Sequence, residues 1–449
     1  MLKSFTPNFY LENHPDPETA LRIRQQMDEI AVLIEKMNAR EQAGNKVLVM
    51  AAMVFLTSSL AYTVYQLSDV NTVFTSSLPS LFTVLEFSTA RRFLTRLAEI
   101  DFLPVDFGSE DPYMIREVQF TKQHPRTRPM RVCIPVGLGA GIDVDCQGPG
   151  GFLKLGFGSI EVGPISIEPS QAVEENSLQL LPHSVIGHSR RSDGSLGLDE
   201  VGDRISARIE QRNDDMLTRN TVIGASIKVC SVEDVSKMLS HANLIRTADY
   251  VSIDVTGIKD AESIVGIIER LDSESRKKGS VPPFFIKVSL GQSFPPSSAV
   301  TAAITASESV VGVNVAGYGL ASGNNKQITK FSTSEDVTVS GVMIREKATQ
   351  AVGEWYKALG RGSRGKEIIA SGGVLTGKDA LEKIEAGASF VNVFSAFVLD
   401  GPPVARRIKT QLSVQLMNKG YYNLDEAIGA NHREKSRRLK HAEKRRKRF

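Results

Sequence analysis

Eight short apolar runs rich in β-branched residues recur through the middle and end of this chain, and most are followed by a helix-like segment. Runs such as FVNVF and VVGVNV are almost continuously apolar, which suits parallel strands covered on both faces. This alternation predicts an α/β fold, a (β/α)8 TIM barrel, with a doubly wound open sheet as the alternative. The predicted strands are Cys133–Leu138, Phe157–Gly163, Thr221–Ser226, Tyr250–Val255, Phe284–Leu290, Val310–Val315, Glu367–Ser371 and Phe390–Phe394.

Two connections in this pattern, residues 164–220 and 316–340, are longer than the usual loop between a strand and a helix. In a barrel, such excursions after the strands cover the active site. Gly372-Gly373 ends the seventh run and Phe394-Ser395 ends the eighth. Loops at these two positions, with a helix N-terminus, bind phosphate in barrels, so the sequence predicts a phosphate-bearing ligand. The alternative is that the glycines only make tight turns.

The composition is that of a globular protein, with 41% apolar and 23% charged residues. It excludes a chain that is disordered throughout and a polytopic membrane protein. Cys133, Cys146 and Cys230 form no CxxC pair, which argues against a disulfide framework or a cysteine-built zinc site. No group of His, Asp and Glu has the spacing of metal ligands, so no metal is predicted.

Residues 47–67 form an uncharged segment of 21 residues, long enough as a helix to cross a bilayer once. A buried core helix is the alternative. Arg40 and Lys46 lie just before this segment, and the next basic residue is Arg91. This asymmetry places the N-terminus on the matrix or cytoplasmic side of a single-pass transmembrane anchor.

Residues 1–46 contain an amphipathic helical segment, whose start is signalled by Asp16 and Pro17. Its apolar stripe requires a partner: the body of the protein, the membrane, or another protein bound through residues 17–43. The residues of the stripe are Ile23, Met27, Ile30, Ile34 and Met37.

The end of the chain is a basic tail, residues 433–449, with ten Lys or Arg residues against Glu434 and Glu443. A run of this kind can neutralise phosphates on RNA or on anionic lipid. No aromatic residues are interleaved with the charges, so the tail offers charge and no stacking on bases. Binding to RNA, binding to lipid, and a solvated tail without a partner all remain open.

Several segments together resemble the dihydroorotate dehydrogenase family, in its membrane-bound, quinone-linked class 2. They include PVGLGAGIDVDCQGPGGFLKLGFGSIEVG, PPFFIKVSL and ASGGVLTGKDALEKIEAGASFVNVFSAF, and the resemblance ends on the class signature AIGANHR. It implies a helical cap over residues 68–128, with its second helix at Ser88–Ile100, ahead of a barrel over residues 129–432. It also implies FMN as cofactor, ubiquinone entering between the cap helices, and a place in the mitochondrial inner membrane.

The resemblance implies that this chain keeps most of the residues of a flavin site. Lys287 matches a strand lysine whose ammonium faces the flavin, with a structural ion pair as the alternative. Asn314 matches an asparagine that binds the pyrimidine substrate, with a loop-capping role as the alternative. The other implied flavin positions are Ala140, Gly141, Gly163, Ser226, Ser340, Gly341, Gly372, Gly373, Phe394 and Ser395.

The reactive half of the site departs from the family pattern. Gly257 stands where the family has its serine base, and it has no proton acceptor. Thr256 would reach that position only by a one-residue slip, which turns a strand side chain to the other face. Asp254 replaces a substrate-binding amide, and its carboxylate would repel the carboxylate of orotate. The other departures are Val144 for a lysine, Ser226 and Lys259 for asparagines, Val315 for a threonine and Pro164 for a hydroxyl residue.

These departures favour a dihydroorotate-dehydrogenase-like pseudoenzyme that serves as a structural subunit or assembly factor of a mitochondrial complex. The alternative is an active FMN-dependent enzyme that oxidises dihydroorotate to orotate in pyrimidine biosynthesis, or a related flavin oxidoreductase. In the active family, the serine base takes a proton while hydride passes to the flavin, which ubiquinone then reoxidises.

Overall fold

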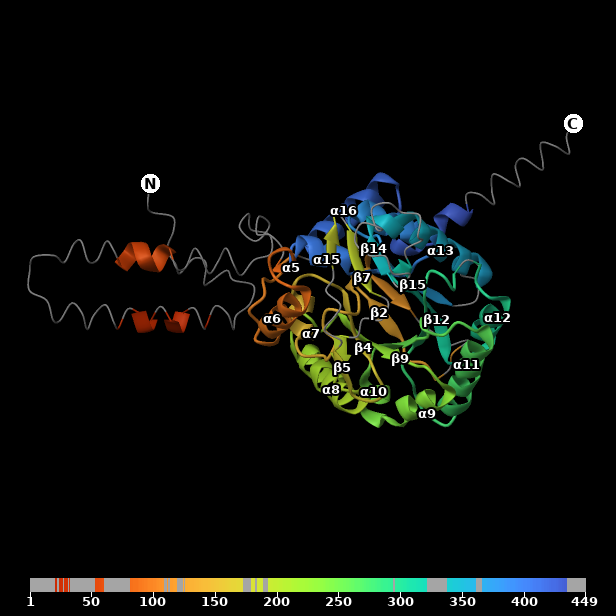
Figure 1. Ribbon diagram of the computed structural model, residues 1–449. Helices are drawn as coiled ribbons and strands as arrows, with labels where there is room; N and C mark the ends of the chain where they lie inside the picture. The colour runs from red at the N-terminus through yellow and green to blue at the C-terminus, as the bar shows by residue number, and fades with distance from the viewer. Residues whose placement is uncertain are drawn as a thin grey trace, which may run out of the picture. The chain divides into compact units, whose positions relative to one another are not determined.

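The computed structural model describes most of the chain from residue 81 onward and short stretches before it (Figure 1). The described residues are 21, 24–26, 28–30, 32, 53–59, 81–108, 111, 114–118, 124, 126–172, 179–181, 184–188, 193–293, 295–320, 337–360 and 366–433. The chain divides into two compact units, Met1–Leu67 and Ser68–Phe449.

In the first unit, residues 53–59 are helical, as are the described positions between 21 and 32. Among the residues that the structure describes, no helix is both long and apolar enough to cross a membrane. Most of the predicted anchor at 47–67 and of the apolar stripe within 17–43 lies outside the described residues, so both stay predictions. The same holds for the basic tail beyond Arg433.

Eight parallel strands in the second unit close into a barrel, which confirms the (β/α)8 prediction and excludes the doubly wound sheet. Around the barrel the order is β10-β11-β12-β15-β16-β3-β4-β9. The strands are β3 (Val136–Leu138), β4 (Ser159–Ile165), β9 (Val222–Lys228), β10 (Tyr250–Asp254), β11 (Phe284–Val288), β12 (Val310–Val315), β15 (Glu367–Ser371) and β16 (Phe390–Val393). The predicted first strand begins three residues too early, because Cys133 to Pro135 form a bend before β3.

Helices surround the barrel on its outer side (Figure 1). They begin where the sequence supplies caps: Ser231 and Thr376 each form a capping box with an aspartate three residues later, ahead of α9 and α14. The helices after the first two barrel strands are α7 (Pro149–Lys154) and α8 (Leu198–Asp214). The later ones are α9 (Val232–Ser240), α10 (Ala242–Thr247), α11 (Ala261–Ser275), α12 (Ser298–Ala306), α13 (Arg345–Ala358), α14 (Gly377–Ala386), α15 (Ser395–Asp400), α16 (Val404–Asn418) and α17 (Leu424–Ala427).

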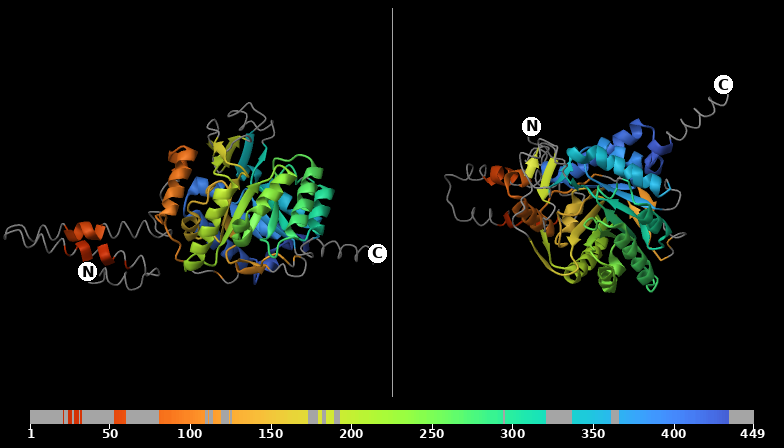
Figure 2. Two further views of the ribbon diagram at one scale, coloured as in Figure 1. Left: turned by 90° about the horizontal axis from the view of Figure 1, so that it is seen from below. Right: turned by 45° about the vertical axis from the view of Figure 1, so that its right-hand side comes forward.

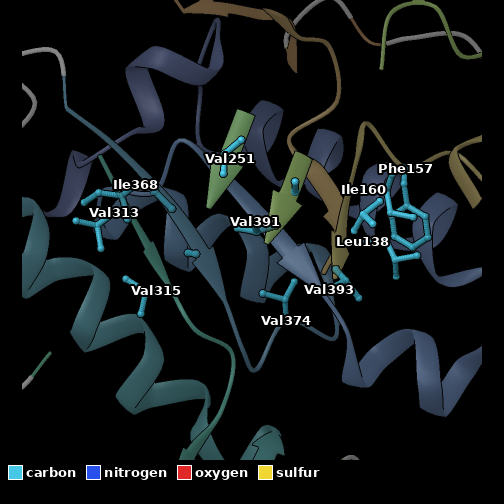
Figure 3. Packing of buried hydrophobic residues seen from close by; sticks show 14 of the residues in the cluster. Leu138, Phe157, Ile160, Val251, Val313, Val315, Ile368, Val374, Val391 and Val393 are labelled. Carbon is cyan, nitrogen blue, oxygen red and sulfur yellow. The ribbon is translucent and has the colours of Figure 1, made fainter. Parts of the chain in front are cut away.

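The main hydrophobic core lies between the barrel strands and these helices. Figure 3 shows Leu138 and Ile160 gathered beside Phe157, and Val313 near Ile368 on the neighbouring strand. These side chains are at most 2% exposed. Because the strands are covered from outside and filled from inside, most strand residues are apolar, as the sequence pattern predicts.

The two long excursions join each other in a four-stranded antiparallel sheet of order β13-β14-β7-β6. The strands are β6 (Gln179–Leu181) and β7 (Ser184–His188) from the first excursion, and β13 (Gly319–Leu320) and β14 (Val337–Gly341) from the second. Figure 2 shows β7 and β14 projecting from the barrel. A smaller pair, β5 (Ser170–Ala172) with β8 (Asp193–Ser195), lies within the first excursion, and the 3-10 helix η2 (Val342–Ile344) follows β14.

A helical cap precedes the barrel, formed by α5 (Leu81–Val84) and α6 (Phe87–Glu99). Phe82 stacks on Phe87 with ring centroids 5.1 Å apart and meets the edge of Phe397 at 6.3 Å. The ring of Phe87 lies 6.2 Å from that of Phe394. The cap is thus packed against α15 and the end of β16 by aromatic rings. The hairpin of β1 (Arg116–Val118) and β2 (Met130–Val132) follows it.

Candidate active site

Apolar side chains fill one end of the barrel interior. The edge of Phe285 lies 5.7 Å from Tyr250, and Phe390 lies 6.2 Å from it, measured between ring centroids. Phe390 and Tyr250 belong to strands that are not neighbours, so their rings meet across the inside of the barrel. The eight buried residues of this layer are Met130, Val132, Val222, Tyr250, Phe285, Val311, Ile369 and Phe390.

Above this layer lies the buried carboxylate of Glu161, only 1% exposed. Its Oε1 accepts a hydrogen bond from Lys287 Nζ at 2.8 Å, and its Oε2 accepts one from Asn314 Nδ2 at 2.7 Å. Three further donors, from Tyr250, Ser252 and Asn392, lie 3.3–3.4 Å from Oε2. An unpaired carboxylate in this place would be strongly destabilising, and the five donors offset that desolvation.

Lys287 extends from the Glu161 layer toward the mouth of the barrel. Its Nζ also donates to Ser226 Oγ at 2.9 Å and lies 3.8 Å from Asp254 Oδ2. Burial alone would lower the pKa of Lys287, but the Glu161 and Asp254 carboxylates outweigh burial and raise that pKa above its ordinary value. The side chain is therefore a protonated ammonium held in an ion pair with Glu161, and its predicted position against the flavin stays a prediction.

Asp254 ends β10 and organises the turn that follows. Its Oδ1 accepts hydrogen bonds from the backbone N–H of Thr256 at 3.1 Å and from Thr256 Oγ1 at 2.5 Å. Tyr318 donates its phenolic proton to Thr256 Oγ1 at 2.9 Å. The three side chains form one hydrogen-bonded series that ends on a carboxylate, with Tyr318 as donor and Asp254 as final acceptor.

Gly257 is exposed next to this series, and a Cβ added to it would meet no atom within 4 Å. The position predicted for the base therefore has space and no functional group. Val144 is buried at 1% exposure, so an apolar side chain stands where the family has a lysine. Lys259 is exposed.

Gly372 and Gly373 both adopt positive φ angles, +90° and +68°. A Cβ at Gly373 would lie 2.4 Å from the Cα of Arg345, at the start of α13, and one at Gly372 would lie 2.7 Å from Ile344 Cδ1. Glycine is thus required by the backbone conformation and by the close approach of the η2–α13 segment. These contacts explain why both residues are glycines, and the predicted binding of phosphate by their backbone N–H groups stays a prediction.

Further hydrogen-bond donors near this turn lie at the start of α15. Phe394 is its N-cap and makes no side-chain capping bond, and the first N–H groups of a helix have no partner within the helix. Ser395 Oγ, buried beside them, donates to Ser340 Oγ at 2.7 Å. Backbone N–H groups and a hydroxyl gathered between β14, β15 and β16 fit the donor set that a phosphate monoester needs.

The remaining predicted flavin positions also come together. Gly141 N donates to Gly163 O at 2.7 Å, and a Cβ on Gly141 would lie 3.0 Å from the Phe394 ring. A Cβ on Gly163 would lie 2.4 Å from Ser226 O. Ala140 precedes Gly141, and Gly341, at φ +87°, follows Ser340. Asn314 lies deeper, fully buried, with its amide nitrogen bound to Glu161 and to Ser252 at 2.9 Å.

Sequence reasoning missed Glu161, Tyr250, Ser252 and Asn392, the polar residues that hold Lys287 and Asn314. The sequence does indicate a polar centre inside the barrel, since Glu161 is a charged residue within the otherwise apolar run SIEVG. A charge on the covered face of a barrel strand requires a partner inside the barrel.

A family model of dihydroorotate dehydrogenase matches residues 129–416. The mitochondrial dihydroorotate dehydrogenase (quinone) of Mus musculus is 27% identical over 370 residues, which cover 79% of this chain and 89% of that protein. The dihydroorotate dehydrogenase (quinone) of Erythrobacter litoralis is 27% identical over 313 residues, covering 66% and 84%. The crystal structure of DHODH from Eimeria tenella in complex with ferulenol superposes with a TM-score of 0.66 at 27% identity, covering 77% of this chain and 95% of that one.

Proposed function

The chain belongs to the dihydroorotate dehydrogenase family, and from that premise we propose that it is a mitochondrial inner-membrane member that does not oxidise dihydroorotate. In this proposal the flavin-phosphate site is partly kept, while the catalytic base and the orotate site are lost. The barrel then serves as a structural subunit or assembly factor of a mitochondrial complex.

One observation carries the proposal: the base position is Gly257, exposed and without any atom within 4 Å of where a side chain would begin. Loss of a positioned base alone lowers the rate by ~10²–10⁴. Asp254 adds a negative charge where the family's substrate carries a carboxylate, and like charges at close range disfavour binding. Val144 and Val315, both buried, remove two further polar contacts.

The residues present fit FMN best at its phosphate end, held by the first turn of α15 with Ser340 and Ser395. The turn at Gly141 and Gly163 and the ammonium of Lys287 would hold the ring. When bound, FMN supplies a hydride acceptor. Lys287 is already paired with Glu161, so it would stabilise negative charge on a bound flavin less than an unpaired ammonium would.

A structural role needs surfaces for partners, and the two ends of the chain supply candidates. The segment 17–43 would bind a protein partner through its apolar stripe, and the tail 433–449 would bind RNA or anionic lipid through its charge. The anchor at 47–67 would place the chain in the mitochondrial inner membrane as a single-pass protein.

A second candidate function is favoured by the hydrogen-bonded series of Tyr318, Thr256 and Asp254. Thr256 Oγ1 lies 2.5 Å from Asp254 Oδ1. The hydroxyl proton of Thr256 can therefore pass to the Asp254 carboxylate while the hydroxyl oxygen takes a proton from a bound substrate. In this alternative the protein is an active flavin oxidoreductase, with ubiquinone as electron acceptor and Thr256 in place of the missing serine.

Anaerobic addition of dihydroorotate to the purified full-length protein distinguishes the two candidates. We expect no bleaching of bound flavin between pH 6 and pH 9. Rapid bleaching in the wild type, lost in Thr256→Val, would overturn the pseudoenzyme proposal and assign the base. Valine keeps the β-branched shape of threonine and removes only the hydroxyl.

A further inference from the structure

A small cavity of about 170 Å³ opens at the end of the barrel opposite the mouth. Met130 and Val222 line it with apolar surface, and both belong to the apolar layer that closes this end of the barrel. Val222 is the first residue of β9, and Asp249 immediately precedes β10. The cavity is therefore at the N-terminal ends of the strands, remote from the flavin-phosphate groups that follow β15 and β16.

Arginine side chains dominate the charge of this cavity. Arg212, 7% exposed, forms an ion pair with Asp249 and donates to the carbonyl oxygen of Thr221 at 2.8 Å. Asp249 Oδ2 also accepts the backbone N–H of Ile223 at 2.7 Å. These contacts fix one arginine and neutralise it with the only carboxylate among the lining residues.

Two further arginines of the lining, Arg131 and Arg219, are exposed, and neither side chain forms a hydrogen bond or ion pair with any residue that the structure describes. Arg128, next to Pro129 of the lining, donates to the carbonyl oxygens of Ile245 and Ala248, at 2.9 and 2.7 Å. Three arginines of the lining thus face a single carboxylate, Asp249, and Glu117 lies opposite Arg131 in the β1–β2 pair. Guanidinium groups recognise carboxylate and phosphate through paired N–H donors.

From this arrangement we propose that the cavity binds a small, water-soluble oxyanion, a phosphate or carboxylate group, between Arg131 and Arg219. The volume supports this class of ligand. Pockets for drug-sized molecules and cofactors measure roughly 300–1,000 Å³, so about 170 Å³ suits a single anionic group better than a nucleotide or a flavin. The proposal does not depend on the proposed function, because no residue of the mouth contributes to it.

The test is isothermal titration of the full-length protein in neutral detergent, at low ionic strength, with inorganic phosphate and separately with succinate. We expect saturable binding of at least one of them with one site per chain. The double variant Arg131→Ala, Arg219→Ala should bind at least about tenfold more weakly, because each lost guanidinium removes charge-assisted hydrogen bonds. The two anions tell phosphate recognition from carboxylate recognition.

A matched control removes two arginines from elsewhere in the same unit, Arg92→Ala with Arg276→Ala. Both are exposed, on α6 and after α11, and the pair lowers the net charge of the protein by the same amount. Binding should be unchanged in this control. The proposal is overturned if neither anion binds saturably to the wild type, or if both double variants weaken binding equally, which would indicate general charge attraction. Since all four residues are exposed, circular dichroism should report the same fold for both variants.

Discussion

Inside the barrel, Glu161 gathers donors from β10, β11, β12 and β16 around a single carboxylate. This explains why Lys287 can be buried and still protonated. It also means that the carboxylate of Glu161 and the ammonium of Lys287 are satisfied by side chains of the barrel itself, while the amide oxygens of Asn314 and Asn392 are buried without a hydrogen-bond partner among the described residues. Lys287 and Asn314 therefore have structural partners that are independent of any pyrimidine substrate.

At the scale of one residue, Asp143 should make the stability of the protein depend on pH. Burial raises the pKa of Asp143 to about 6, although the backbone N–H groups of Gln147 and Gly148 donate to it at 2.8 and 3.1 Å. A carboxyl whose pKa is higher in the folded state binds more protons there, so its contribution to stability falls as pH rises from about 4 to about 6. A shift of about 2 units corresponds to roughly 3 kcal/mol.

Urea unfolding of the wild type and of Asp143→Asn at pH 4, 5, 6 and 7 measures this contribution. We expect the free energy of unfolding of the wild type, relative to the variant, to fall by about 2–3 kcal/mol across this range. Comparing the two proteins removes the effect of other titrating groups. A difference that does not change with pH would show that Asp143 ionises normally in the folded protein.

Gly257, the residue that we propose replaces the base, gives a second prediction at this scale. Because a side chain at Gly257 would meet open space, Gly257→Ser should change the free energy of unfolding by less than about 1 kcal/mol. It should recover little reduction of bound flavin by dihydroorotate, since Asp254 and Val144 would remain. Recovery of rapid reduction by this single change would show that the rest of the substrate site is intact.

At the scale of elements, the turn after β15 is held against the start of α13 more tightly than its sequence suggests. Gly373→Ala would place a Cβ 2.4 Å from the Arg345 backbone, at a residue with φ +68°. We expect this variant to lose about 2–3 kcal/mol of stability without any ligand, because both the contact and the backbone conformation disfavour a side chain. A substitution at this position therefore cannot be read simply as a change in phosphate binding.

The control for this prediction is Gly279→Ala, where an added Cβ meets no atom within 4 Å. Urea unfolding of both variants, after removal of any flavin by dialysis against high salt, compares them directly. The control should differ from the wild type by less than about 0.5 kcal/mol. Equal stability of the two variants would mean that α13 can move away from the turn.

At the scale of the whole molecule, the cap and the barrel share one core, so the unit from Ser68 onward should unfold in a single transition. A chain that begins at Glu86 keeps α6 but loses Phe82, a 4% exposed ring packed on Phe87 and Phe397. We expect this shorter chain to be about 3 kcal/mol less stable, as for the deletion of a buried aromatic side chain. Differential scanning calorimetry of the two chains tests both statements, and two separate transitions in the longer chain would contradict the shared core.

The sequence alone determined the features that depend on neighbours in the chain. The eight strands appear in it because a strand covered on both faces must be apolar along its length, and the helices follow capping signals such as Thr376. The prediction that no base stands at Gly257 is equally local, since it rests on one residue in a recognisable motif.

The tertiary structure decided what depends on contacts between distant parts of the chain. Glu161 meets Asn392 across 231 positions, β7 pairs with β14, and Gly373 approaches Arg345. The cavity between Arg131 and Arg219 exists only because β2 and the start of β9 close the same end of the barrel. The local pattern of apolar residues predicts whether a residue is buried. It does not predict which side chain that residue contacts, because the contact depends on barrel closure, on strand register and on the path of the two excursions.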